Sequence, residues 1–300
     1  MPETRDTAAL RRHYEVETEL AGRLRAAAPA ERLRLYRDVY NELFRRVPDH
    51  PQNRWKVDDR EQNRRVEEQL RLLARHLARD RVYLEIGAGD CQLARVVAGR
   101  VRYAYGVDVS DVISATDARP PNFAFLLSNG TAIPAPDGCA GVAFSNMLVE
   151  HLHPDDFGSH LLEVARVLAP GGVYVCRTPH RFSGPQDISQ FFDRVATGLH
   201  LREYTFAELT TRFRAAGFAS VRIEVPLKRR LFRCPGRLFR LLEAALGHVP
   251  HSLRTRLCRS VVFRPLFRTI TVVARTPTRR EVGDCGVVAA LRRASGYSGR

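Results

Sequence analysis

The sequence predicts an α/β fold built around a mostly parallel, doubly wound β-sheet. From residue 81 onward, short apolar runs rich in β-branched side chains alternate with stretches of helical spacing, which is the pattern of parallel strands joined by crossover helices. The first run, residues 82–86, ends at Gly87 and Gly89 and continues as a helical stretch, which indicates strand, tight turn and helix. These two observations predict a ligand site at the carboxyl ends of the strands.

The strands and helices of this domain follow one another in a regular order. Each expected strand ends in polar or turn-forming residues, and each expected helix has apolar residues at helical spacing. A helix at 155–168 is stopped by Pro170, Gly171 and Gly172. In chain order we expect strands at 82–86, 103–109, 123–127, 140–145, 173–178, 220–225 and 269–275, and further helices at 91–99 and 111–117.

The first turn has the features of a nucleoside site. Gly87 and Gly89 let the backbone take positive φ and let a ligand approach without a Cβ in the way. The second expected strand closes on Asp108, roughly 20 residues later, as expected when an acid accepts the hydroxyl groups of a ribose. A dinucleotide-binding turn would have a third glycine at the position of Gln92, so that pattern fails here. The alternative is that Glu85 and Asp108 only cap or solvate turns.

Five short motifs resemble those of class I S-adenosylmethionine (SAM)-dependent methyltransferases. The first is a hydrophobic-Glu-x-Gly-x-Gly turn, and the third, before the fifth strand, is similar to the Arg-Val-Leu-Lys-Pro-Gly-Gly turn of that family. The sequence departs from the family at Cys91, where a glycine is common. The motifs lie at 84–89, 146–151, 166–172, 206–209 and 216–218, and the resemblance covers 81–225 and 269–275.

The resemblance implies SAM as cofactor and a Rossmann-like, doubly wound, seven-stranded sheet whose last strand is antiparallel. It implies that Glu85 lies near the methionine end of SAM, that Asp108 holds the ribose, and that Asn146 lies near the methionine carbon. Asn129 is at the position where members of the family contact the adenine, and its side-chain carbonyl can accept a hydrogen bond from the adenine amino group. The alternative is that Asn129 and Gly130 form an ordinary turn. The SAM-binding residues implied are Glu85, Gly87, Gly89, Asp108, Val109, Asn129, Gly130 and Asn146.

The acceptor is expected to bind at the loop after the fifth strand, which is polar and interrupted by Pro and Gly. SAM carries an activated methyl, so the enzyme must mainly align the acceptor and, for a hydroxyl acceptor, remove its proton. His180 is the first candidate for this base and His200 the second, with ordering of the next helix as the alternative for His200. For His151 we favour a structural turn. Arg181 is the candidate anchor for a carboxylate or phosphate.

No metal-binding spacing is visible in the sequence, so no metal is expected. The six cysteines are scattered without a C-x-x-C pair, which indicates a reducing compartment and argues against a structural zinc. No apolar run approaches the ~20 residues needed to span a bilayer, and the N-terminus lacks the apolar stretch of a signal peptide. We expect a cytoplasmic protein, with peripheral contact at the inner face of the membrane as a further option.

Charge is concentrated in one segment of the 300-residue chain, whose net charge is +15. Residues 226–268 hold 11 basic side chains and a single acid, Glu243. Residues 81–225, by contrast, hold 13 basic and 15 acidic side chains. Apolar stripes within the segment predict basic amphipathic helices. They either cap the core or meet an anionic partner, which we rank as lipid, phosphorylated carrier and nucleic acid in that order. Nucleic acid comes last because the core is neutral and few aromatics accompany the arginines.

Three regions are expected along the chain. Residues 1–80 form a helical N-terminal extension, which either covers the cofactor or substrate or only stabilises the core. Residues 81–276 form the SAM-binding domain, with 226–268 as a basic helical insertion. Residues 277–300 form a flexible tail.

The function expected from these features is methyl transfer from SAM. The acceptor is a small-molecule, sugar-like or carrier-linked compound, methylated at oxygen in preference to nitrogen or carbon. The alternative is a non-catalytic SAM- or nucleoside-binding protein that acts through its basic segment at a membrane surface or partner. An NAD-dependent oxidoreductase is disfavoured by Gln92.

Overall fold

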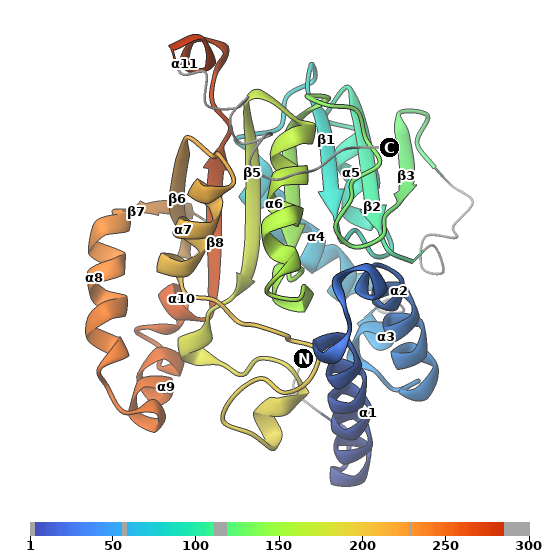
Figure 1. The fold of residues 1–300 in the computed structure, drawn as a ribbon, viewed down its shortest axis with the longest axis vertical. Helices are drawn as coiled ribbons and strands as arrows, with labels where there is room; N and C mark the ends of the chain where they lie inside the picture. The colour runs from blue at the N-terminus through green and yellow to red at the C-terminus, as the bar shows by residue number, and fades with distance from the viewer. Residues whose placement is uncertain (1–3, 56–58, 111–118, 228–229, 285–300) are drawn as a thin grey trace.

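An eight-stranded sheet organises the residues that the computed structural model describes, namely 4–55, 59–110, 119–227 and 230–284. The strand order is β3-β2-β1-β4-β5-β8-β6-β7, with helices on both faces, which confirms the predicted fold class (Figure 1). The strands are β1 Val82–Ile86, β2 Tyr103–Asp108, β3 Phe123–Leu127, β4 Ala140–Asn146, β5 Leu168–Pro179, β6 Ser220–Leu227, β7 Arg230–Cys234 and β8 Thr269–Arg275.

The direction of the strands follows the expected scheme, with one addition. Strands β1 to β5 pair in parallel, and β8 lies antiparallel between β5 and β6, so the antiparallel last strand is confirmed. The eighth strand is β7, which forms a hairpin with β6 at the edge of the sheet. The expected helical insertion at 226–268 included residues 230–234. That was wrong, because Leu231 of this short run packs its side chain against the core as part of a strand.

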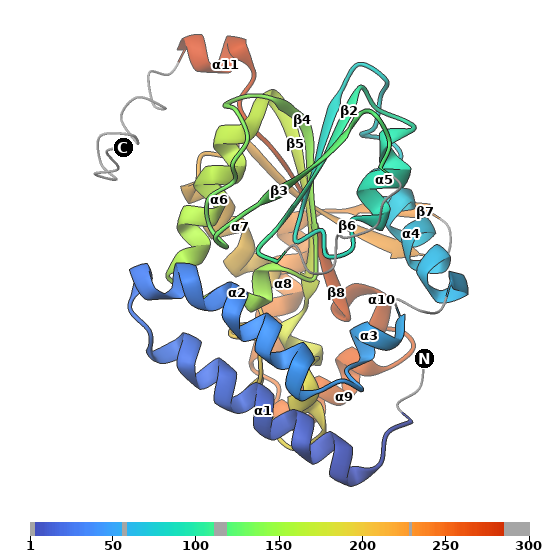
Figure 2. The same cartoon turned by 90° about the vertical axis from the view of Figure 1, so that its right-hand side faces the viewer.

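Helices cover the two faces of the sheet and enclose a separate apolar core on each face (Figure 2). Helices α4 (Asp59–Leu73) and α5 (Gln92–Ala98) pack on one face, and α6 (Asp156–Val167) and α7 (Phe206–Ala215) on the other. The expected helices at 91–99 and 155–168 are therefore present. The helix expected at 111–117 lies outside the described residues.

The N-terminal extension crosses the end of the sheet to which the parallel strands point (Figures 1 and 2). It consists of α1 (Thr7–Ala26), α2 (Pro29–Arg46), α3 (Pro51–Trp55) and α4, and α2 ends before Pro48 as the prolines require. Helix α2 is anchored by Arg32, whose Nε and Nη2 donate to the two carboxylate oxygens of Asp156 at 2.7 and 2.6 Å. Tyr36 donates to the same carboxylate at 2.8 Å.

The basic segment packs one side against the core and leaves the other exposed. Its helices are α8 (Gly236–Gly247), α9 (His251–Arg259) and α10 (Arg264–Phe267). Phe239, Glu243 and Leu246 of α8 are buried, whereas Leu238 and Leu241 are 62% and 68% exposed. No helix among the described residues is both long and apolar enough to cross a membrane. The expected tail starts with a short helix, α11 (Arg279–Asp284).

Candidate active site at the carboxyl ends of the strands

A pocket of about 1220 Å³ lies at the carboxyl ends of β1, β2, β4 and β5. It is centred on the point where the strand order reverses, with β2 on one side of β1 and β4 on the other, which is where open α/β sheets bind ligands. Side chains of α1, α2 and α4 and of the loop at 186–200 complete its walls. The N-terminal extension therefore covers the edge of the sheet at which the pocket lies. It also fixes the loop at 186–200, because Glu17 of α1 accepts a hydrogen bond from the Leu199 N–H at 3.1 Å.

The turn after β1 is held in a left-handed conformation by two glycines and a cysteine. Gly87 has φ 71°, Gly89 has φ 54°, and Cys91 has φ 58°. A Cβ on Gly89 would meet no atom within 4 Å, so the space beside this residue is open to a ligand. The chain thus keeps the expected turn at Cys91 without glycine, and the buried thiol packs against Gly106, where a Cβ would lie 2.7 Å from its Sγ.

Asp108 ties the end of β2 to this turn. Its Oδ2 accepts from the Gly89 N–H at 2.8 Å, and its Oδ1 accepts from the N–H groups of Val109 at 2.7 Å and Ser110 at 3.2 Å. Backbone donors on three sides fix the carboxylate at the wall of the pocket. It stands where a ribose would be held, so the structure brings Asp108 and the glycines together as the sequence predicted.

Two buried polar atoms at the floor of the pocket have no hydrogen-bond partner among the described residues. They are Oε2 of Glu85 on β1 and Oδ1 of Asn146 at the end of β4, and both residues line the pocket. Burial, and then the negative charge of Asp90, hold the pKa of Glu85 well above its ordinary value. Two orphaned acceptors fit a ligand that brings hydrogen-bond donors or a positive charge to this floor, such as the ammonium group of an amino acid.

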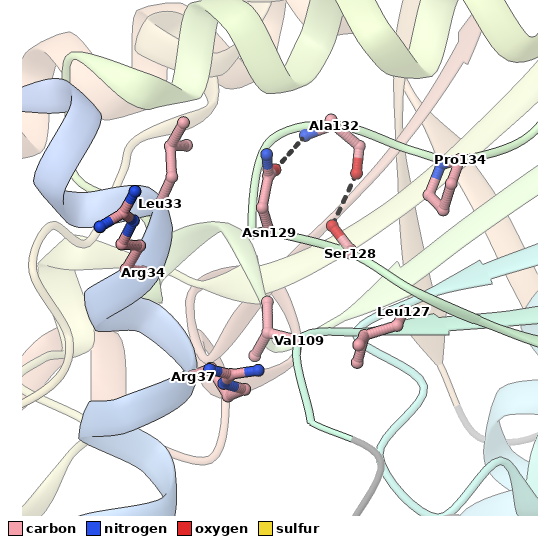
Figure 3. A pocket seen from close by; sticks show the side chains of 9 residues that line it. All are labelled: Leu33, Arg34, Arg37, Val109, Leu127, Ser128, Asn129, Ala132 and Pro134. Atoms are coloured by element: carbon pink, nitrogen blue, oxygen red, sulfur yellow. Dashed lines mark hydrogen bonds between the residues drawn. The ribbon is translucent and has the colours of Figure 1, made fainter.

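A smaller hollow of about 440 Å³ adjoins the pocket beyond Val109 (Figure 3). Asn129 lines it, but its carbonyl accepts from the N–H groups of Ala132 at 2.9 Å and Thr131 at 3.2 Å, so this oxygen holds a turn and is not free to face an adenine amino group. The turn reading of Asn129 is therefore the one that the structure supports. Gly130, at φ 98°, lies under Tyr36 of α2, whose Cδ2 would be 2.6 Å from an added Cβ.

His180 does not face the pocket, so its prediction as the base is wrong. Its side chain is fully buried; Nδ1 accepts from the Phe182 N–H at 3.0 Å, and Nε2 therefore carries the proton and donates to Glu243 at 2.8 Å. Burial keeps the pKa of His180 below its ordinary value. The ring lies among Phe182, Phe239 and Phe267, because the basic segment folds back over the residue that follows β5.

His200 does line the pocket, but it is a poor base. Its Nδ1 lies 2.9 Å from Glu203 Oε1. Burial lowers the pKa of His200, but the hydrogen bond to Glu203 and the charge of Glu150 outweigh it and raise the pKa to about 9. The imidazole is therefore a cation near neutral pH and already holds the proton that a base would have to take up.

His151, which the sequence pattern favours as a structural turn residue, lines the pocket. Its Nδ1 donates to the Leu199 carbonyl at 3.0 Å, and burial lowers its pKa to about 3, so the ring is neutral with an open Nε2. The adjacent Glu150 accepts from the Thr178 hydroxyl at 2.9 Å, and burial raises its pKa to about 7. One ligand atom each of Glu150, His151 and His200 lie within 4.8 Å of one another. The sequence predicted no such cluster, because residues 50 positions apart form it.

The arginine that lines the pocket near the end of β5 is not the predicted anion anchor, Arg181, but Arg177. Arg181 is exposed and donates to Glu208 at 2.8 Å, away from the pocket. Arg177, near the end of β5, lines the pocket instead, and its guanidinium makes no hydrogen bond or ion pair to the described residues. Its Nε is buried, and burial lowers its pKa. Its position at the carboxyl end of a parallel strand was the signal that could have identified it.

Residues 84–176 match a protein-family model described as "Methyltransferase domain". This range holds β1, the glycine turn, Asp108, Asn146 and the Glu150–His151 pair. Residues 84–176 therefore match a methyltransferase domain, and the resemblance to SAM-dependent methyltransferases predicted from the sequence is confirmed.

Similarity to individual proteins extends over parts of the chain. A Mycolicibacterium smegmatis protein described as "Probable S-adenosylmethionine-dependent methyltransferase" is 33% identical over 144 residues, which are 48% of this chain and 54% of that protein. The chain thus spans about half the length of this curated relative.

Two solved structures resemble the chain at lower identity. A Burkholderia thailandensis 1,6-didemethyltoxoflavin-N1-methyltransferase is 17% identical, with a TM-score of 0.48, over 84% of this chain and 91% of that one. A Haloferax volcanii complex between the Trm112 methyltransferase activator and a methyltransferase contains a chain that is 19% identical, with a TM-score of 0.49. The match covers 69% of this chain and 87% of that one.

Proposed function

We propose that the protein transfers the methyl group of SAM to a small-molecule, sugar-like or carrier-linked acceptor that bears a carboxylate or phosphate group. An anionic group on the acceptor is inferred from Arg177, whose guanidinium lies in the pocket without a partner among the described residues. A guanidinium in this setting is stabilised by a bidentate anion, which none of the described side chains supplies. Arg268, which also lines the pocket without a hydrogen bond from its side chain to the described residues, adds positive charge at the same wall.

The residues at the strand ends fit SAM. Asp108 would accept from the ribose hydroxyl groups, Glu85 would face the ammonium group of the methionine part, and the hollow beside Val109 would take the adenine. When bound, SAM supplies a methyl group already activated on a sulfonium. The chain's own task is then to place the acceptor in line with it and to exclude water, for which α1 and α2 form the roof.

The position of Arg177 supports this arrangement of the acceptor. Arg177 pairs with Asn146 across β4 and β5, so the anion anchor and the floor residue beneath the methionine part are direct neighbours in the sheet. We favour transfer to oxygen. His151 and His200 line the same pocket and Glu150 lies beside them, with a pKa that burial raises to about 7, so this cluster would act on a hydroxyl proton.

Changing Arg177 to Gln is the test of the acceptor class. Each hydrogen bond to a charged group contributes about 1.5–3 kcal/mol, so the KM for the acceptor should rise about tenfold to a hundredfold while the affinity for SAM stays the same. Methyl-labelled SAM, incubated with cell extract and either enzyme, identifies the labelled product by mass spectrometry. Arg181→Gln is the matched control and should leave the KM unchanged.

The outcomes separate the proposal from its alternative. An uncharged product, or a product formed equally well by Arg177→Gln, would contradict an anionic acceptor. SAM binding without any labelled product would favour the non-catalytic SAM-binding protein instead.

A second candidate property is contact of the basic segment with an anionic membrane surface, at the inner face of the membrane. Leu238 and Leu241 on α8 are 62% and 68% exposed, and Val261 and Val262 after α9 are 90% and 77% exposed. Exposed apolar side chains among arginines suit a surface that is negatively charged outside and apolar beneath. Packing on the core buries only some of the apolar side chains of α8, and Leu238 and Leu241 remain exposed.

Vesicle sedimentation tests this contact. Each basic residue near an anionic surface contributes roughly 1 kcal/mol, so changing Arg233, Arg237 and Arg256 to Gln should weaken binding to phosphatidylglycerol vesicles about a hundredfold. Binding should also fall as salt rises, because the Debye length is only ~8 Å at physiological ionic strength. The matched control changes three exposed arginines of the core domain to Gln: Arg100, Arg102 and Arg214. Equal sedimentation of both variants, or binding to neutral vesicles, would leave the segment as a cap on the core.

A further inference from the structure

Three side chains from two distant segments converge at the wall of the pocket, which His151 and His200 line. Glu150 and His151 lie in the 3₁₀ turn Val149–His151 that follows β4, and His200 lies in the loop before α7. One carboxylate oxygen and one nitrogen of each ring lie within 4.8 Å of one another. Ligand atoms bound about 2.1 Å from one ion lie no more than about 4.2 Å apart, so a small closing of the cluster would let all three atoms reach a single ion.

Each ring is oriented through its Nδ1. His151 Nδ1 donates to the Leu199 carbonyl at 3.0 Å, and His200 Nδ1 lies 2.9 Å from the carboxylate of the buried Glu203. Glu203 is itself fixed, because its Oε1 also accepts from the Gln186 N–H at 2.7 Å. Metal-binding histidines are held in this way, with one nitrogen bonded to a carbonyl or carboxylate and the other open. Neither Nε2 makes a hydrogen bond to the described residues.

Glu150 supplies an independent sign of a missing partner. Its side chain is fully buried, and Oε2 accepts from the Thr178 hydroxyl at 2.9 Å, but Oε1 is buried without a hydrogen bond to any residue that the structure describes. Buried polar atoms are normally satisfied, so the orphaned carboxylate oxygen in this cluster points to a missing cation. Binding of an ion would require His200 to release its proton, as metal-binding histidines do.

We propose that Glu150, His151 and His200 bind one divalent transition-metal ion. Two imidazoles and one carboxylate suit Zn²⁺ or Fe²⁺, and the remaining coordination positions would face the pocket. The ion would lower the pKa of a bound hydroxyl group, which is what methylation at oxygen requires. That role rests on the function proposed above, whereas the binding of the ion does not.

A second cluster of the same composition differs in its hydrogen bonds. His13, Glu17 and His50 are buried and equally close together. There, however, His13 Nδ1 accepts from Arg5 at 2.8 Å and His50 Nδ1 accepts from the Gln52 N–H at 3.2 Å, so the protons sit on the Nε2 atoms and point to Glu17. Glu17 Oε1 accepts from His13 at 2.7 Å. His50 Nε2 lies farther away, 3.8 Å from the same oxygen. Both oxygens of Glu17 already have donors, His13 and the Leu199 N–H, so this cluster serves as a matched control.

Titration of the metal-stripped full chain with Co²⁺ tests the site by visible absorption and calorimetry. One equivalent should bind, with d–d bands and without thiolate charge-transfer bands. His151→Ala and His200→Ala should each weaken binding by a hundredfold or more, and Glu203→Gln, which removes only the partner of His200, by tenfold to a hundredfold. His50→Gln should bind as the unmodified chain does.

Folding and SAM affinity are measured on every variant, so that loss of the ion is not mistaken for unfolding. Glu203→Gln keeps all three ligands and is informative even if a ligand variant fails to fold. Failure of the unmodified chain to bind one equivalent, or equal binding by the His151→Ala, His200→Ala and Glu203→Gln variants, would overturn the site. Loss of activity with the ion still bound would count against the proposed function and not against the metal.

Discussion

Asp108→Ala is expected to weaken SAM binding by about tenfold to a hundredfold. A carboxylate that accepts from ribose hydroxyl groups contributes about 1.5–3 kcal/mol per hydrogen bond, and about 1.4 kcal/mol corresponds to a tenfold change in Kd. The same change leaves the N–H groups of Gly89, Val109 and Ser110 without their acceptor, so the turn that faces the cofactor also loosens. Calorimetric titration with SAM measures the effect.

Two companion variants locate the cause of the loss. Asp108→Asn keeps an acceptor for one backbone N–H but removes the charge, so its affinity should lie between those of the unmodified chain and Asp108→Ala. Asp90→Ala removes a nearby acid of the same turn, whose carboxylate accepts from the Gln92 N–H at 3.1 Å, and should cost much less. A folded Asp108→Ala protein with unchanged SAM affinity would rule out the proposed role of this carboxylate.

Arg32→Ala is expected to lower the free energy of unfolding by about 3–5 kcal/mol. Arg32 and Asp156 are 2% and 7% exposed and are joined by two hydrogen bonds, so removing one partner leaves a buried charge unpaired. Helix α2 also loses its tie to α6, and Tyr36, which shares the carboxylate, would no longer be fixed over Gly130. SAM affinity should therefore fall together with the midpoint of denaturant unfolding.

The double variant gives a sharper test than either single one. Arg32→Ala combined with Asp156→Ala removes the orphaned charge, so it should be less destabilised than the sum of the two single changes. Arg45→Ala, an exposed arginine of the same helix, should change stability by less than about 0.5 kcal/mol. Additive effects of Arg32→Ala and Asp156→Ala would show that the pair does not anchor the extension.

Much of the fold could be predicted from the sequence because it depends on local patterns. The periodicity of apolar residues predicts β1 to β6, α5 and α6 with small errors at their ends, and β5 begins earlier than expected because Leu168 already pairs with Ala140 before a register shift. The strand β7 was missed, since a short edge strand among basic residues has no clear alternation. Gly87, Gly89 and Asp108 were found because they occupy fixed places after a strand.

The sequence by itself determined the order of the strands along the chain, the glycine turn with Asp108, and the resemblance to SAM-dependent methyltransferases. Only the tertiary structure decided which polar side chains share the pocket. His180 is buried because Glu243, 63 positions away, packs against it, whereas none of the described side chains pairs with Arg177 in the pocket. Burial and pairing depend on contacts between distant residues, so a pattern read along the chain names residue types but not the surroundings that set their charge.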